Sequence, residues 1–136
     1  NHIFYMWLTD TFFVHKEIKE GIDFYASLLA RDKRNPGSRI SRGYAYLEKG
    51  RLEAGFRRPE EATASFNLAI QSAGQDNTLL APARLWRGYA ADLRGNRESA
   101  LADYRAVLSL PNVDETHRNA QRFLKAPYKG ASSLLM

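Results

Sequence analysis

The sequence has no cysteine and only three histidines, His2, His15 and His117, among its 136 residues. The absence of cysteine excludes disulfide bonds, thiolate metal ligands and a cysteine nucleophile. The three histidines are far apart in the sequence and do not show the spacing of a metal site. No glycine-rich phosphate-binding pattern is present either. We therefore expect no metal ion, no cofactor and no enzymatic activity.

Long apolar runs are also missing. Residues 3–8 and 12–14 are apolar, but Asp10 separates them and charged residues follow from His15. A membrane span needs about 20 apolar residues. The run also lacks the basic lead-in and the small-residue cleavage site of a signal peptide. We expect a soluble chain with no membrane span, and the cytoplasm is the favoured location.

The composition is that of one ordinary globular domain, with 44% hydrophobic and 26% charged residues. The formal net charge is +5, and most of the basic residues are arginine. Such a charge is compatible with an acidic partner, nucleic acid or an anionic membrane surface. Because the arginines are spread along the chain, we favour a solvated basic surface.

Three segments repeat a small, an aromatic and an aliphatic residue at intervals of four positions. The three sets are Gly21, Tyr25 and Leu29; Ala62, Phe66 and Ile70; and Ala100, Tyr104 and Leu108. This spacing places each set on one face of a helix. Because no stretch shows sustained strand alternation, the pattern predicts an all-α fold of paired helices.

Two glycine pairs precede the second and third of these segments. Gly43 and Gly50 have the same separation as Gly88 and Gly95, and both pairs begin within the string Arg-Gly-Tyr-Ala. We expect Gly50 and Gly95 to end helices, since glycine adopts left-handed dihedrals easily. Within a helix glycine costs about 1 kcal/mol relative to alanine. Gly43 and Gly88 therefore predict close approach of another helix.

Seven helices are predicted from periodicity and from end signals. Proline is acceptable in a first turn, so Pro59 begins one helix and Pro82 lies in the first turn of another. Asn96 and Asp114 are expected to cap the last two helices. The expected ranges are 3–14, 16–31, 38–49 with an extension toward 54, 59–72, 79–94, 97–110 and 115–125.

These residues resemble the tetratricopeptide repeat, a helical hairpin that repeats every ~34 residues. The match in the third unit rests on Gly88, Gly95, Ala100, Tyr104, Val107 and Leu108. The match in the second unit rests on Gly43, Gly50, Ala62, Phe66, Ala69 and Ile70, with an insertion after Gly50. The chain departs from the family at an early tryptophan position, where Arg84 stands shortly before Trp86.

The resemblance implies one domain over residues 1–136, built as a short right-handed superhelix of stacked hairpins. We expect a degenerate repeat at 3–34, a repeat at 36–73 with its insertion near 51–59, and the best-matching repeat at 78–111. Residues 114–125 would form a capping helix, because the exposed end of a solenoid needs a cover. Residues 126–136 are expected to form a frayed or extended tail.

In that family the first helices of the repeats line a concave groove that binds a peptide or an extended partner segment. Carried over by position, the groove residues are Ile40, Tyr44, Leu47, Leu85, Tyr89 and Asp92. Ile3, Met6, Asp10 and Phe13 are the corresponding positions of the first unit, and Phe56, Arg57 and Arg58 are possible further contacts. Tyr44 and Tyr89 are expected side by side, in the same register of adjacent helices. For Ile40 and Leu85 a place in the core remains equally open.

Other interpretations stay open beside a protein partner. The positions of the family's basic clamp are held by apolar and aromatic residues, so a partner's acidic C-terminus is not implied. Arg31, Lys33, Arg34, Arg39 and Arg42 surround one turn and could contact nucleic-acid phosphates. Nucleic-acid binding is disfavoured because aromatic residues are not interleaved with them. The third interpretation is a self-associating structural domain of a larger protein.

Overall fold

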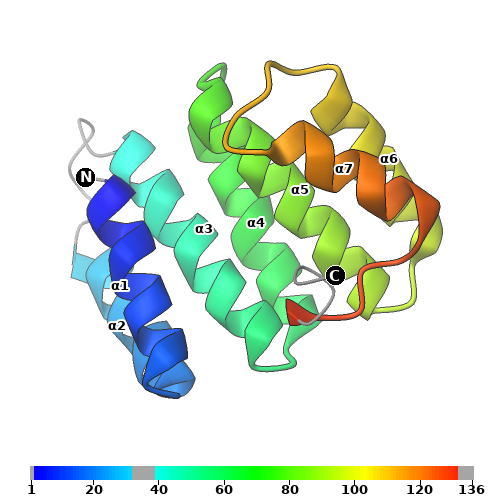
Figure 1. The fold of residues 1–136 in the computed structure, drawn as a ribbon. Helices are drawn as coiled ribbons and strands as arrows, with labels where there is room; N and C mark the ends of the chain where they lie inside the picture. Colours follow the sequence, from blue (N-terminus) through cyan, green and yellow to red (C-terminus); the bar gives the residue numbers. More distant parts are fainter. Residues whose placement is uncertain (1, 32–38, 132–136) are drawn as a thin grey trace.

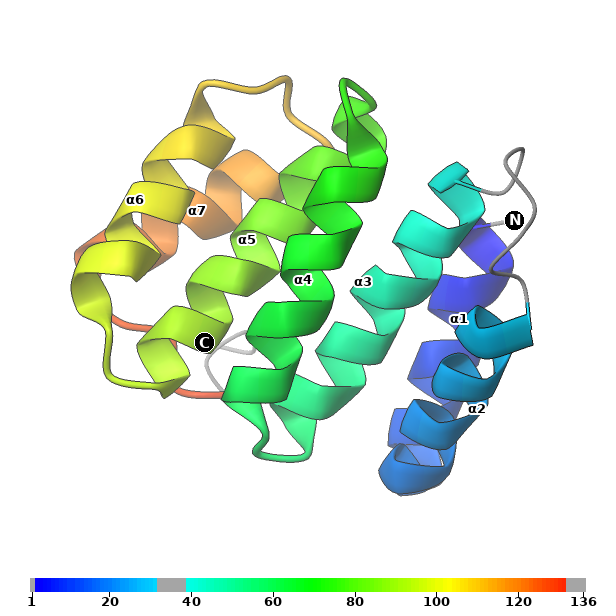
Figure 2. The ribbon, with the colours of Figure 1, turned by 180° about the vertical axis from the view of Figure 1, so that it is seen from behind.

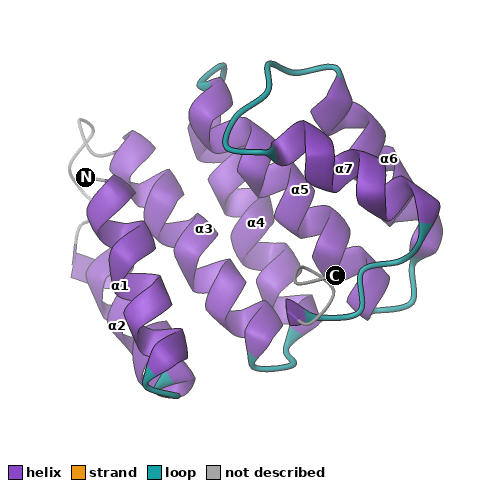
Figure 3. Cartoon of the chain, in the orientation of Figure 1, coloured by secondary structure: helices purple, strands orange, loops and turns teal. Residues whose placement is uncertain are grey.

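The computed structural model describes residues 2–31 and 39–131, and no strand occurs within them (Figure 1). The prediction of an all-α fold with seven helices is confirmed for this part of the chain (Figure 3). The helices are α1 (His2–Val14), α2 (Ile18–Arg31), α3 (Arg39–Gly55), α4 (Pro59–Ala73), α5 (Asn77–Leu93), α6 (Arg97–Leu108) and α7 (Thr116–Lys125).

The helices form three hairpins, α1/α2, α3/α4 and α5/α6, and α7 covers the last one. In Figure 1, α1, α3, α5 and α7 face the viewer. Figure 2 shows α2, α4 and α6 from the opposite side, so the fold has two layers. The first helices of neighbouring hairpins contact each other, α1 with α3 and α3 with α5. This arrangement aligns α1, α3 and α5 along one face of the molecule.

The aromatic residue of each repeated set is fully buried. Tyr25, Phe66 and Tyr104 are 0% exposed. The ring of Tyr104 lies against Gly88 so closely that a Cβ there would be 2.5 Å from Tyr104 Cε1. Phe66 lies against Gly50 in the same way. The close approach expected at Gly88 is thus confirmed, and each of these two hairpins packs an aromatic ring from its second helix onto a glycine of its first.

The second and third hairpins have the same register, without an insertion. One constant offset along the chain, which we call the hairpin offset, relates both ends of α3 to those of α5 and the start of α4 to that of α6. The glycine that accepts the aromatic ring is Gly50 in one hairpin and Gly88 in the other, and the same offset separates them. The turns agree as well, because Arg57 (φ 61°) and Gly95 (φ 78°) are equivalent left-handed residues.

This register corrects two expectations. Gly50 lies inside α3 and does not end it, and the residues near 51–59 are not inserted, because they form the end of α3 and its turn. Gly43 is not the equivalent of Gly88, although it also marks a close approach, to the side chains of Leu79 and Ser72. The shared Arg-Gly-Tyr-Ala strings therefore lie in different places in the two hairpins.

The start of α5 also differs from the expectation. The helix begins at Asn77, where Asp76 Oδ1 accepts a hydrogen bond from Thr78 N at 3.1 Å. Pro82 consequently lies inside the helix and not in its first turn.

Of the two helix caps predicted from the sequence, the structure contains the one before α6 and not the one before α7. Asn96 Oδ1 accepts a hydrogen bond from Ser99 N at 3.2 Å, as expected for the cap of α6. Asp114 does not cap α7, because the residue before that helix is Glu115, in a left-handed conformation (φ 67°) and without a side-chain cap. The chain therefore enters α7 through two left-handed residues, 114 and 115.

Helix α1 packs on α2 and α3 but leaves large apolar side chains exposed. Ile3 is 65% exposed, Phe4 53%, Trp7 62% and Val14 76%. The helix is apolar apart from His2, Thr9, Asp10 and Thr11. Across the described residues, helices of the length and apolarity needed to cross a membrane are not found.

Candidate functional site

A pocket of about 170 Å³ opens between α3 and α5, and we call it the α3–α5 pocket. A cavity of about 150 Å³ holds one benzene molecule, so this pocket fits one side chain. Met6 of α1 lies at its edge, 38% exposed. The other lining residues are Tyr44, Leu47, Glu48, Arg51, Thr78, Pro82, Leu85, Trp86, Tyr89, Asp114, Thr116 and Asn119.

Four of the six predicted groove residues line this pocket: Tyr44, Leu47, Leu85 and Tyr89. All four are buried, between 1% and 7% exposed, so they form the floor and walls of the pocket and not an open surface. Tyr44 and Tyr89 do not share a register as expected. With the hairpin offset, Leu47 corresponds to Leu85 and the equivalent of Tyr89 is Arg51.

Arg51 lines the α3–α5 pocket but is missing from the groove residues predicted from the sequence, because that prediction used a different register. Its Nη1 donates to Glu48 Oε1 at 2.7 Å, and its guanidinium lies 5.2 Å from the centre of the Trp86 ring. The Glu48 side chain is 1% exposed, and burial raises the pKa of its carboxyl above the ordinary value. Spacing along α3 could have found both residues, since 44, 47, 48 and 51 share one helical face.

Two polar atoms near the pocket have no hydrogen-bond partner among the described residues. They are Nε of Arg51 and the hydroxyl of Tyr89, and both are buried. Buried donors are normally satisfied, so each unpaired one destabilises the state that buries it. Burial also raises the pKa of the Tyr89 hydroxyl above its ordinary range.

The pocket mouth has an acidic side. Burial raises the pKa of Tyr44 to about 12, and the nearby carboxylates of Asp76 and Asp114 act in the same direction. Asp114 is exposed and lines the pocket. A basic group next to an apolar group therefore complements this mouth electrostatically.

The other two predicted groove residues lie elsewhere. Ile40 is half-buried and packs against the core shared by α3, α4 and α5, because it lies one turn before Tyr44. The side chain of Asp92 is only 1% exposed and is held by internal contacts. Neither residue is available to a partner in the α3–α5 pocket.

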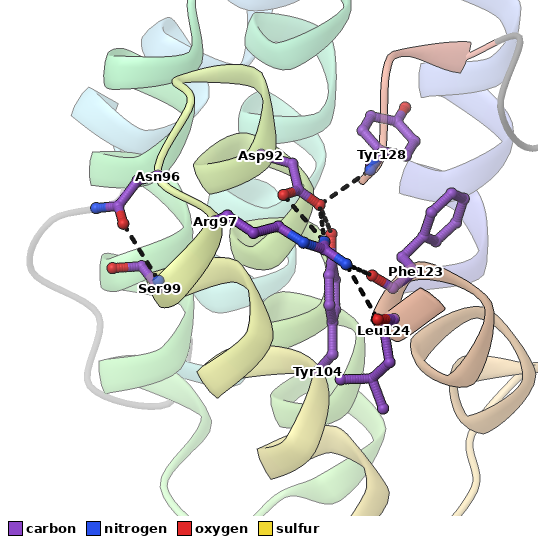
Figure 4. A network of polar contacts seen from close by, with 8 residues as sticks. All are labelled: Asp92, Asn96, Arg97, Ser99, Tyr104, Phe123, Leu124 and Tyr128. Atoms are coloured by element: carbon purple, nitrogen blue, oxygen red, sulfur yellow. Dashed lines mark hydrogen bonds and ion pairs between the residues drawn. The ribbon is translucent and has the colours of Figure 1, made fainter. Parts of the chain in front are cut away.

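Asp92 is the centre of a polar network that joins α5, α6 and the segment after α7 (Figure 4). Both of its oxygens accept from Arg97 Nη1, at 3.1 and 2.9 Å. Its Oδ2 also accepts from the Tyr104 hydroxyl at 2.7 Å and from the backbone N–H of Tyr128 at 2.9 Å. Arg97 in turn donates to the Phe123 carbonyl at 2.6 Å.

The further contacts expected around the turn between α3 and α4 do not join the α3–α5 pocket. Phe56 is 39% exposed, and the Arg58 guanidinium lies 4.7 Å from its ring centre.

Phe13 packs on Gly55. Phe13 and Arg57 line a second pocket of about 750 Å³ between α1, α3, α5 and residues 128–131. Asp10 is exposed and its Oδ1 lies 3.4 Å from Arg51 Nη2.

The basic turn after α2 is only partly described. Lys33 and Arg34 lie outside the described residues, while Arg31 and Arg39 are exposed. Arg42 is engaged within the fold, since its Nη1 donates to the Leu29 carbonyl at 2.8 Å. The described part of this cluster therefore offers fewer open guanidinium groups than the sequence suggested.

The histidines have local places in the fold. His117 Nε2 lies 2.6 Å from the Leu110 carbonyl oxygen and so helps to close the turn before α7, while His15 is exposed. Within residues 2–31 and 39–131, no cluster of three or more histidine and acidic side chains could hold a metal ion. Comparison of the chain with family models, curated proteins and solved structures gives no match.

Proposed function

We propose that this chain is a protein-interaction module of the tetratricopeptide type, which binds an extended partner segment across α1, α3, α5 and α7. The observation that carries the proposal is the α3–α5 pocket. It is large enough for one side chain, its walls are apolar and aromatic, and it lies between the first helices of two hairpins. Small concave apolar sites with a few polar groups are typical binding sites.

The charges around the pocket suggest the chemistry of the partner. An apolar side chain fits between Leu47 and Leu85, and a basic residue beside it is attracted by Asp114 at the mouth. The partner segment is therefore an apolar anchor flanked by lysine or arginine. The hairpin offset, from Gly50 to Gly88, is slightly longer than the period of ~34 residues that is typical of the family. The resemblance thus supports the helical-hairpin architecture and not a particular ligand.

A test has to leave the core intact. Replacing Tyr44 and Tyr89 by alanine would remove buried rings, which costs about 3–5 kcal/mol for a large aromatic side chain. A variant that fills the pocket from its mouth avoids this loss. Thr78 is exposed and lines the pocket, so Thr78→Trp blocks the entrance without removing a core residue. Ala64→Trp, at an exposed position of α4 in the other layer, is the matched control.

The experiment selects random dodecapeptides displayed on phage against the immobilised chain, followed by affinity measurement of the enriched peptides. We expect peptides with an apolar anchor and an adjacent basic residue. Thr78→Trp should weaken their binding at least tenfold, and Ala64→Trp less than twofold. The proposal is wrong if no peptide is enriched, or if Thr78→Trp binds the enriched peptides as well as the unaltered chain does.

A further inference from the structure

The segment after α7 buries one side chain, that of Tyr128, in the fold. It runs from the end of α7 back toward the end of α3 (Figure 1). Tyr128 is 4% exposed, while Pro127 and Lys129 on either side of it are exposed. The residue before them, Ala126, has an extended backbone (φ −150°, ψ 143°). Of the two forms expected for the tail, frayed or extended, the frayed one is therefore wrong for residues 126–131.

Three aromatic residues outside the segment surround the ring of Tyr128. It stacks on Tyr89 with ring centres 4.0 Å apart and planes 9° apart. Phe123 meets it edge-on at 5.3 Å and 80°, and Trp86 at 6.3 Å and 68°. The contacts with Phe123 and Trp86 have the edge-to-face geometry that aromatic pairs prefer, and Tyr89 lies nearly parallel to the ring. Together they form a slot shaped for a flat ring.

A side-chain acceptor for a backbone N–H lies beside this slot. Asp92 Oδ2 accepts the N–H of Tyr128 at 2.9 Å (Figure 4). The carboxylate is already positioned by Arg97 and by the hydroxyl of Tyr104, neither of which belongs to the segment. We call the four residues Trp86, Tyr89, Asp92 and Phe123 the Tyr128 seat. The Tyr128 seat contacts both the aromatic ring and the backbone N–H of one residue in an extended segment.

We propose that the Tyr128 seat is a recognition site for an aromatic residue in an extended partner segment, and that residues 126–131 occupy it as an internal competitor. The proposal rests on the proposed peptide-binding function and specifies a second anchor for the partner. Its occupant is an aromatic residue with a free N–H, because those are the two features that the seat holds in Tyr128.

One observation supports exchange of the internal segment for an outside one. Within residues 126–131, Tyr128 is the one buried side chain. A short tether gives the internal segment an effective concentration of roughly millimolar. The apparent affinity for an outside segment is therefore reduced, because it can bind only those molecules whose seat is not filled by the internal segment.

The experiment uses a fluorescein-labelled peptide with the sequence of residues 125–131, Lys-Ala-Pro-Tyr-Lys-Gly-Ala. Its binding to the full chain is measured by fluorescence polarisation. We expect Tyr128→Ala to bind it at least tenfold more tightly than the unaltered chain. Tyr128→Phe keeps the seat filled and should bind as weakly as the unaltered chain. The peptide with alanine in place of tyrosine should not bind any of the three proteins.

A folded Tyr128→Ala chain that does not bind the peptide overturns the proposal. If circular dichroism shows that Tyr128→Ala is unfolded, Tyr128→Leu replaces it and should bind at least threefold more tightly than the unaltered chain. Unfolding of both variants also overturns the proposal, because the segment is then an integral part of the fold. So does dimerisation of the unaltered chain that Tyr128→Ala abolishes, which would assign the seat to a second copy.

Failure here is distinguishable from failure of the α3–α5 pocket. Trp86 and Tyr89 belong to both the pocket and the seat, but Thr78 lines only the pocket. Thr78→Trp should therefore change the affinity of Tyr128→Ala for this peptide by less than twofold. If the labelled peptide does not bind but Thr78→Trp still weakens the selected peptides, the pocket remains supported and the seat does not.

Discussion

Replacing Asp92 by asparagine should destabilise the fold by about 3 kcal/mol, as expected for a buried charge that loses its pairing. The carboxylate is buried, 1% exposed, and accepts four hydrogen bonds from three residues. Asparagine has nearly the same shape, so no cavity forms. In Asp92→Asn the amide oxygen at the Oδ2 position keeps the bonds to Tyr104, Tyr128 and Arg97 Nη1, while the amide N–H₂ group at the Oδ1 position faces Arg97 Nη1 donor to donor.

The magnitude follows from the loss of charge. A hydrogen bond to a charged group contributes about 1.5–3 kcal/mol, and one between neutral groups about 0.5–1.5 kcal/mol. The bonds from Tyr104 and Tyr128 therefore lose about 1 kcal/mol each. The ion pair with Arg97, whose side chain is 31% exposed, contributes about 1 kcal/mol more. Losing one partner of a buried pair costs about 3–5 kcal/mol in general, so about 3 kcal/mol lies at the lower limit.

The assay is urea unfolding at room temperature, monitored by far-ultraviolet circular dichroism. For a chain of this length, about 3 kcal/mol corresponds to a decrease in melting temperature of roughly 10–15 °C. Glu98→Gln, at an exposed position of α6, is the control and should change the free energy of unfolding by less than about 0.5 kcal/mol. A loss below about 1 kcal/mol for Asp92→Asn would refute the reasoning, because the network would then contribute little as an ionic centre.

Two other predictions concern packing and pH. Gly88→Ala should reduce the free energy of unfolding by about 1 kcal/mol in the same urea assay. The new Cβ would lie 2.5 Å from Cε1 of the buried Tyr104 ring. Overpacking costs about 1–3 kcal/mol and outweighs the helix-propensity gain of about 1 kcal/mol. An unchanged or higher urea midpoint would contradict this prediction. Burial raises the pKa of Tyr44 and of Tyr128 from 10.0 to about 12, so the folded state favours their protonated forms. The contribution of these two tyrosines to the free energy of unfolding is then fully present below about pH 10 and is lost between about pH 10 and about pH 12. The urea midpoint should therefore be lower at about pH 11 than at about pH 8. Equal midpoints would contradict the prediction.

Local features were predictable from the sequence because they depend on near neighbours in the chain. Four-residue spacing identified the buried faces that contain Tyr25, Phe66 and Tyr104. Asn96 was recognisable as a cap from its side chain and its place before a helical pattern. Gly88 was recognisable as a close approach because glycine inside a helix needs a compensating contact. The all-α class follows from the same helical periodicity.

The relative register of the hairpins was not predictable in this way. Two Arg-Gly-Tyr-Ala strings suggested that Gly43 and Gly88 are equivalent, and this shifted the second repeat from Gly50 back to Gly43. That shift is about two helical turns, so the shifted assignment still placed apolar residues on a plausible face. It replaced Arg51 by Tyr44 as the counterpart of Tyr89.

The sequence by itself determined the helices and their buried faces, because those depend on contacts between residues one helical turn apart. Only the tertiary structure decided that Gly50 takes the Phe66 ring as Gly88 takes that of Tyr104, since the ring and the glycine are on different helices. It also decided that Asp92 is a structural acceptor and not a groove residue, and that Tyr128 is buried against α5 and α7. These are contacts between distant parts of the chain, and periodicity within one helix carries no information about them.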